Sequence, residues 1–101
     1  MVESAHKSAT RGKYAKTYRR YYLQRHYGIS LEEYDRLLTQ QNGGCAICHE
    51  GKPRRRHAVD HNHKTGKVRG LLCGSCNRAL GYFKDSPELL ASAITYLKGA
   101  E

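Results

Sequence analysis

Apolar residues recur along the first half of this chain at the three- and four-residue intervals of amphipathic helices. One such stretch, 13–27, carries tyrosines on one side, which we expect to pack against a core, and Gly28 follows as a helix cap. A second helix is predicted to begin at Ser30, because Ser30 and Glu33 have the spacing of a capping box, and to end near residues 42–44.

The pattern then changes to two short apolar runs, 57–61 and 68–72, separated by a polar loop that contains Gly66. Runs of this length on either side of a turn predict two antiparallel strands. A short helix is expected over 75–83, and a last helix starts at Ser86 with a proline in its first position. Its periodic apolar residues are predicted to form a core face: Leu89, Leu90, Ala93, Ile94 and Leu97.

These elements predict a small α+β protein, and 101 residues leave room for one domain. Residues 1–12 are polar and lack periodicity, so we expect a flexible basic arm there. The single domain is predicted over 13–101, with its functional core at about 43–85.

A domain this small is expected to need a stabilising cross-link or metal site in addition to its core, and its four cysteines can supply one. They form two CxxC pairs, a spacing that lets each pair present two thiolates to one ion. We therefore predict a closed, structural Zn²⁺ site that joins the end of the second helix to the start of the third, with ligands Cys45, Cys48, Cys73 and Cys76.

Other uses of paired cysteines fit this sequence less well. Two disulfides would suit an exported protein, but the basic N-terminal run lacks the apolar core of a secretion signal, so we expect a cytoplasmic protein. The same argument opposes haem attachment at the CxxCH of residues 45–49, which would also leave Cys73 and Cys76 without a role. A redox pair would be expected within a βαβ pattern, and neither pair lies in one. No apolar run approaches the roughly 20 residues of a membrane helix, so no membrane partner is expected.

The net charge of +9 is concentrated in two blocks. Residues 1–28 hold seven basic and one acidic side chains, and residues 51–84 hold nine basic and one acidic. Such an excess favours a polyanion as partner, because each neutralised phosphate releases condensed counterions. We therefore expect nucleic acid to contact the basic residues around the cysteine motifs: Arg54, Arg55, Arg56, Lys64, Lys67, Arg69 and Arg78.

A second group of polar residues, Asp60, His61 and Asn77, suits hydrolysis of a phosphodiester bond. Neighbouring strand residues point to opposite faces, so Asp60 and His61 need a group from another element to complete one site. If the third helix packs across the hairpin, Asp60 and Asn77 offer hard oxygen ligands to one divalent cation. His61 is then predicted to take the proton from an attacking water.

The order and spacing of these motifs resemble the phage recombination endonuclease VII family, a zinc-bearing branch of the HNH or His-Me finger nucleases. The resemblance covers about 20–85 and rests on the CxxC at 45–48, the DHNH at 60–63, the KVRGLLC at 67–73 and the CN at 76–77. It implies a ββα-metal fold with flanking N- and C-terminal helices.

The resemblance also implies the chemistry of the site. His61 would be the general base, Asp60 and Asn77 would hold a catalytic Mg²⁺ or Mn²⁺, and His63 would contact the scissile phosphate. The reaction would nick or cut double-stranded DNA and leave 3′-hydroxyl and 5′-phosphate ends, inside a prokaryotic or phage-infected cell. A double-strand cut needs two such sites, which would call for a homodimer or for a phage or host partner protein.

One departure from the family pattern limits this reading. A junction-resolving member has an acidic residue one turn after the asparagine, and this chain offers none among Arg78, Ala79, Leu80 and Gly81. We therefore expect nicking or general DNA cleavage rather than junction resolution. The alternative is a non-catalytic, zinc-stabilised module that binds nucleic acid, which charge and cysteines fit equally. A pure binder has no need of a carboxylate such as Asp60 amid positive charge, so the nuclease is preferred.

Overall fold

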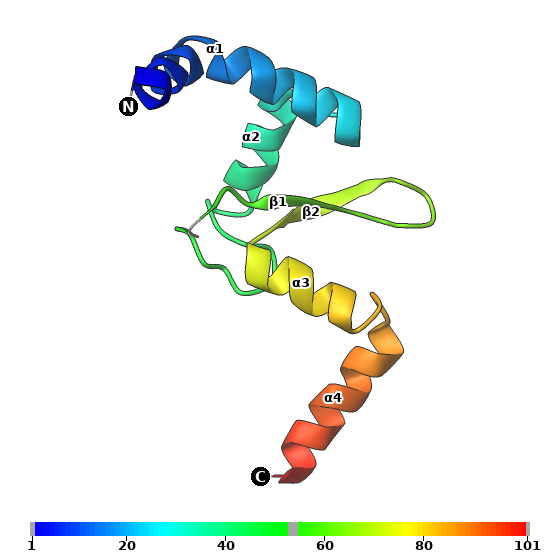
Figure 1. Cartoon of the computed structure of the whole chain (residues 1–101). Coiled ribbons are helices and arrows are strands. Elements are labelled where there is room, and N and C mark those ends of the chain that lie inside the picture. Colours follow the sequence, from blue (N-terminus) through cyan, green and yellow to red (C-terminus); the bar gives the residue numbers. More distant parts are fainter. Residues whose placement is uncertain (1, 53–54, 101) are drawn as a thin grey trace.

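In a computed structural model, helices precede and follow a central antiparallel hairpin (Figure 1). The structure describes residues 2–52 and 55–100, and the side chains among 15–52 and 55–99. Helices α1 and α4 lie at opposite ends of the molecule, and the predicted α+β class is confirmed. The elements are α1 (Val2–Tyr27), α2 (Leu31–Gln40), β1 (Ala58–His61), β2 (Val68–Leu72), α3 (Gly74–Tyr82) and α4 (Pro87–Ala100).

Helix α1 ends where the sequence predicts but begins earlier. Gly28 adopts a left-handed φ of 68°, and its N–H donates to the Gln24 carbonyl at 2.9 Å, which closes the helix. The helix extends back to Val2, so the expected arm over 1–12 is helical from Val2 onward rather than irregular. Alanine and lysine in this stretch favour a helix without needing an apolar face. Met1 lies outside the described residues, and the mobility of the arm stays a prediction.

Helix α2 begins with the predicted capping box. Ser30 Oγ accepts the N–H of Glu33 at 3.0 Å, and the Glu33 carboxylate accepts the N–H of Ser30 at 3.0 Å. Two unpaired donors at the helix start are thereby satisfied. After the helix, Asn42 and Gly43 adopt positive φ values of 57° and 77° and turn the chain toward Cys45.

Strands β1 and β2 form the predicted antiparallel hairpin, with one irregularity. Asp60 pairs with Gly70 and His61 pairs with Val68, so Arg69 has no partner across the sheet. This arrangement is a β-bulge, which bends a strand and redirects a side chain. The Arg69 guanidinium consequently reaches the Asp60 carboxylate.

The loop between the two strands is held by Asn62. Its Oδ1 accepts the N–H groups of Lys64 at 2.8 Å and Thr65 at 3.0 Å, and its own N–H donates to the Lys67 carbonyl at 2.8 Å. Gly66 supplies a positive φ of 78°. Since asparagine and glycine favour such turns, the loop sequence itself closes the hairpin.

The main hydrophobic core lies between α1, α2 and the hairpin. The hydroxyl of Tyr34 donates to the His57 carbonyl at 2.6 Å, so this buried polar group is satisfied. The predicted packing of the α1 tyrosines is wrong for Tyr18 and Tyr21, which are 67% and 60% exposed, because Leu23 fills the core instead. The buried core residues are Leu23, Ile29, Tyr34, Val59 and Leu71.

Helices α3 and α4 differ in how they pack. Helix α3 lies against both strands, whereas α4 extends away from the hairpin (Figure 1). Helix α4 starts as predicted, with Ser86 Oγ accepting the N–H of Leu89 at 3.1 Å. The predicted core face is wrong, because Leu89, Ile94 and Leu97 are 45%, 54% and 61% exposed. Among the described residues, no helix combines the length and apolar content that a membrane crossing needs.

One side chain, Gln41, covers the outer edge of β2. Its Nε2 donates to the carbonyls of Leu71 at 2.9 Å and Gly44 at 2.8 Å, and its Oε1 accepts the N–H of Leu71 at 2.9 Å. The amide thus takes the place of a neighbouring strand at Leu71. A Cβ at Gly70 would lie 3.1 Å from the Gln41 Oε1, so the glycine there leaves room for this contact.

Replacing Gln41 by alanine removes three hydrogen bonds and leaves the Leu71 N–H without its partner, while the Leu71 carbonyl keeps the N–H of Ala46. We expect the free energy of unfolding, measured by chemical denaturation, to fall by about 2 kcal/mol. The exposed neighbour Gln40 is the matched control, and Gln40→Ala should change that value by no more than about 0.5 kcal/mol. Equal unfolding free energies for the two variants would contradict the role given to Gln41.

Candidate metal centre and catalytic residues

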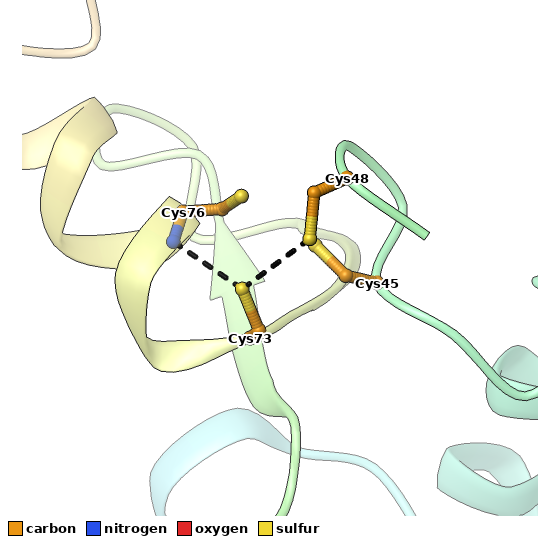
Figure 2. Close-up of side chains that lie close together, drawn as sticks. All are labelled: Cys45, Cys48, Cys73 and Cys76. Carbon is orange, nitrogen blue, oxygen red and sulfur yellow. Dashed lines mark hydrogen bonds between the residues drawn. The ribbon is translucent and has the colours of Figure 1, made fainter. Parts of the chain in front are cut away.

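The four cysteines meet at one point, although they come from two distant segments. Cys45 and Cys48 lie in the loop after α2, and Cys73 and Cys76 lie at the start of α3 (Figure 2). Their four sulfur atoms lie within 4.8 Å of one another, and the Sγ atoms of Cys48 and Cys73 are 3.7 Å apart. Four thiols thus face one small space and are positioned to bind a metal ion.

The spacing of the sulfurs is compatible with structural zinc. With Zn–S bonds of about 2.3 Å, an ideal tetrahedron places its sulfurs roughly 3.8 Å apart. The separation of 3.7 Å between Cys48 and Cys73 is close to that value. All four cysteines are free thiols, so no disulfide competes for them. The predicted ligand set therefore comes together as the CxxC spacing indicates.

Backbone contacts hold the first pair of cysteines. The N–H of Cys45 donates to the Glu50 carbonyl at 3.1 Å, and the N–H of His49 donates to the Cys45 carbonyl at 2.9 Å. The N–H of Ile47 points at the Cys45 sulfur at 3.4 Å. A Cβ on Gly44 would lie 2.5 Å from the His49 carbonyl oxygen, so the loop closes only with glycine at this position.

The second pair uses the first turn of α3. Cys73 is the N-cap residue, and its Sγ accepts the N–H of Cys76 at 3.4 Å. The start of a helix favours negative charge, because its unpaired N–H groups carry partial positive charge. A metal-bound Cys73 sulfur would lie at this end of the helix. Leu80 of the same helix packs with Leu72 against the buried cysteines.

The cysteine thiols differ in their acidity. Burial raises the pKa of Cys45, but backbone N–H groups of Cys48, Cys73 and Ile47 outweigh it and lower that pKa to about 6. Burial and hydrogen bonds to the other cysteine sulfurs raise the pKa of Cys76 to about 12. The thiols alone therefore share few negative charges, and a divalent cation would draw out the remaining protons.

A second polar cluster joins the hairpin to the turn between α3 and α4. Arg69 Nε lies 2.7 Å from Asp60 Oδ2, and Arg69 Nη2 lies 3.0 Å from Asp60 Oδ1. Arg69 Nη2 also lies 3.3 Å from Asp85 Oδ2, which is 3.2 Å from His63 Nε2. The hydrogen bonds that Arg69 donates to Asp60 are the main cause of a raised pKa for Arg69. The buried Asp60 is thus held by a charge-assisted, bidentate pair.

Two of the predicted catalytic residues, His61 and His63, lie next to each other, and Asp60 directly precedes His61 in the chain. The ring centroids of the two histidines are 4.8 Å apart, and that of His61 is 6.1 Å from the ring of Tyr27. The fourth predicted residue, Asn77, is exposed on α3, and its side chain forms no hydrogen bond with the described residues. Its pairing with Asp60 around a cation stays a prediction.

No motif in the sequence points to Asp85 as a residue of this cluster. This residue adopts a left-handed φ of 54° after α3, and its N–H donates to the Leu80 carbonyl at 2.8 Å. Aspartate is one of the few side chains that accept this conformation readily. The following Ser-Pro pair marks a turn in the sequence, but no local pattern indicates that the turn reaches the hairpin.

Two clefts are lined in part by basic residues that are predicted to contact nucleic acid. One lies between the hairpin loop and the α3–α4 turn, and Lys64 and Arg69 form part of its lining. The other lies beside the start of α3, and Arg55 and Arg78 form part of its lining. Basic side chains therefore lie beside both the cysteine cluster and the ion pair of Asp60 with Arg69. Of the remaining predicted contacts, Arg56 and Lys67 are exposed, and Arg54 lies outside the described residues.

Comparisons with known proteins found a matching family profile and similar phage proteins. The sequence profile described as recombination endonuclease VII matches residues 20–99. The Gene 59 protein of Mycobacterium phage D29 is 50% identical over 74 residues, which are 71% of this chain and 45% of that protein. The Gene 59 protein of Mycobacterium phage L5 is 47% identical over 73 residues, which are 70% of this chain and 44% of that protein. The matched part of the chain thus spans less than half the length of these curated relatives.

Replacing Cys73 by serine is expected to lower metal content and stability together, because a hydroxyl is a poor zinc ligand and metal binding contributes to folding. Elemental analysis should find about one zinc per chain in the parent protein and much less in the variant. The thermal midpoint should fall by roughly 10 °C or more. Ser75→Ala, at an exposed position between the two thiols, is the control that should retain both properties. A Cys73→Ser protein with unchanged zinc and melting would rule out the structural metal site.

Proposed function

We propose, because this chain belongs to the recombination endonuclease VII family, that it is a divalent-metal-dependent DNA endonuclease of the HNH type. The family match over 20–99 carries the proposal, since it includes both cysteine pairs, Asp60, His61 and Asn77. The proposed reaction is hydrolysis of phosphodiester bonds in double-stranded DNA, as a nick or a cut. The products would carry 3′-hydroxyl and 5′-phosphate ends.

In this proposal, β1, β2 and α3 form a ββα-metal unit, and the four cysteines hold a structural zinc that braces it. The packing of α3 against both strands supports this assignment. Strand β1 carries Asp60 and His61, and α3 carries Asn77 one residue after its last thiol. Helix α3 therefore connects the cysteine cluster, through Cys76, to the proposed catalytic residues, through Asn77.

His61 is the proposed general base. An imidazole can accept a proton from water near neutral pH, and this one would act on the water that attacks the phosphorus. His63, whose side chain is 68% exposed, would donate a hydrogen bond to the scissile phosphate. The short distance between the two rings supports their action on one phosphate group.

Asp60 and Asn77 would hold the catalytic Mg²⁺ or Mn²⁺, because carboxylate and amide oxygens suit hard cations. When bound, such a cation would stabilise charge on the phosphate and on the departing 3′ oxygen. Arg69 is compatible with this role, since each carboxylate oxygen has two lone pairs and the guanidinium takes one on each. The rigid guanidinium would keep the Asp60 carboxylate in one orientation.

DNA is the proposed substrate, and the basic clefts would bind the phosphates that flank the scissile bond. Lys64, Arg55 and Arg78 are the strongest candidates, because Arg69 is already paired with two carboxylates. A double-strand cut would need a second copy of the chain or a partner protein that brings another site.

The direct test of the proposed function is cleavage of supercoiled plasmid DNA by the purified protein, with and without Mg²⁺ or Mn²⁺. His61→Ala should reduce cleavage by at least about 100-fold, because it removes the general base. Zinc content and DNA binding should remain close to those of the parent protein. His26→Ala is the matched control, since His26 is an exposed histidine of α1, and it should leave cleavage unchanged.

Two results would reject the proposal. Undiminished cleavage by His61→Ala would remove the assigned base. Tight DNA binding by the parent protein without metal-dependent cleavage would instead support the non-catalytic binding module.

A further inference from the structure

We propose that Asp85 is a positioning residue of the nuclease site, an inference that rests on the proposed function. Asp85 belongs to the turn between α3 and α4, yet it contacts two residues of the hairpin region. A single oxygen, Oδ2, lies 3.3 Å from Arg69 Nη2 and 3.2 Å from His63 Nε2. The turn therefore forms one wall of the site that the hairpin carries.

Through Arg69, Asp85 affects the orientation of Asp60. The Arg69 guanidinium lies between the two carboxylates and donates to both. Its donors form a rigid plane, so fixing one part of the plane fixes the rest. The Asp85 side chain is 24% exposed and that of Arg69 is 39% exposed, so water competes only partly for this contact. Asp85 thus restrains the arginine that holds Asp60, the proposed cation ligand.

Through His63, Asp85 affects the group proposed to contact the phosphate. The His63 side chain is 68% exposed, and among the described residues Asp85 is its polar partner, while the His61 ring lies to one side. With Nε2 donating to Asp85, Nδ1 remains for other partners. Without the carboxylate, the ring would rotate more freely, so fewer molecules would present it correctly at any moment.

The backbone of the turn does not depend on the Asp85 side chain. Backbone hydrogen bonds join the N–H of Lys84 to the Gly81 carbonyl at 2.9 Å and the N–H of Asp85 to the Leu80 carbonyl at 2.8 Å. Lys84 and Asp85 both adopt left-handed φ values, 56° and 54°. Asparagine and glycine accept this conformation, so Asp85→Asn and Asp85→Gly can remove the charge or the whole contact without straining the turn.

Steady-state cleavage of plasmid DNA with Mg²⁺ tests the inference. For Asp85→Asn and Asp85→Gly we expect kcat to fall about tenfold, with the larger loss in the glycine variant, while KM for DNA stays within about twofold. Asp35→Asn is the charge-matched control, because Asp35 is an exposed aspartate of α2 that lines neither cleft. Asn42→Gly is the backbone-matched control at another left-handed position, where φ is 57°. Both controls should keep the parent kcat.

The outcomes separate this inference from the proposed function. Cleavage by the parent protein with unchanged kcat in both Asp85 variants overturns the inference alone. An equal loss in Asn42→Gly, or a lower thermal midpoint in both Asp85 variants, also overturns it, because the effect would then be structural. Absence of cleavage by the parent protein overturns the proposed function itself.

A second measurement does not depend on catalysis. Histidine side-chain NMR at one fixed pH should show shifted and broadened His63 ring resonances in Asp85→Gly, and unchanged ones in Asp35→Asn. Unchanged His63 resonances in Asp85→Gly would contradict the contact on which the inference depends.

Discussion

The meeting of four thiols from two separate segments is the constraint on which this structure depends. Four thiolates this close would repel one another, so all four can lose their protons only around a cation, and a bound metal ion would then join the two segments. Cys73 is also the residue that follows β2 and caps α3, so fixing its sulfur fixes the angle between hairpin and helix. The proposed catalytic residues lie on the hairpin and on α3, so the same angle would set their positions relative to one another.

Few contacts supplement this cysteine cluster, because the hydrophobic core consists of only a small number of buried side chains. In place of a neighbouring strand, the side-chain amide of Gln41 forms hydrogen bonds with the open edge of β2 at Leu71. The β-bulge has a comparable role in the site. Because Arg69 lacks a partner across the sheet, its side chain can pair with Asp60 and extend to Asp85. The hairpin therefore positions the charged side chains of Asp60 and Arg69 in addition to contributing to the core.

Features that depend on neighbouring residues could be predicted from the sequence. The capping box at Ser30, the end of α1 at Gly28, the two strands and the four-cysteine cluster all follow from residue types a few positions apart. Features that depend on distant contacts could not. Periodicity shows which residues of a helix share a face, but not whether anything covers that face. It therefore does not single out Leu23, and the prediction that the apolar face of α4 lies in the core is wrong. The bulge at Arg69 and the reach of Asp85 depend in the same way on how separate elements meet.

The measurement that tests the account most directly is a titration of the reduced, metal-free protein with Co²⁺, a spectroscopic substitute for zinc, with absorbance and circular dichroism recorded together. The account predicts strong visible bands of a tetrahedral, four-thiolate centre that saturate at about one ion per chain, with a parallel gain of folded structure. Weak bands typical of six-coordinate cobalt, or a dichroism spectrum that does not change as the ion binds, would contradict it.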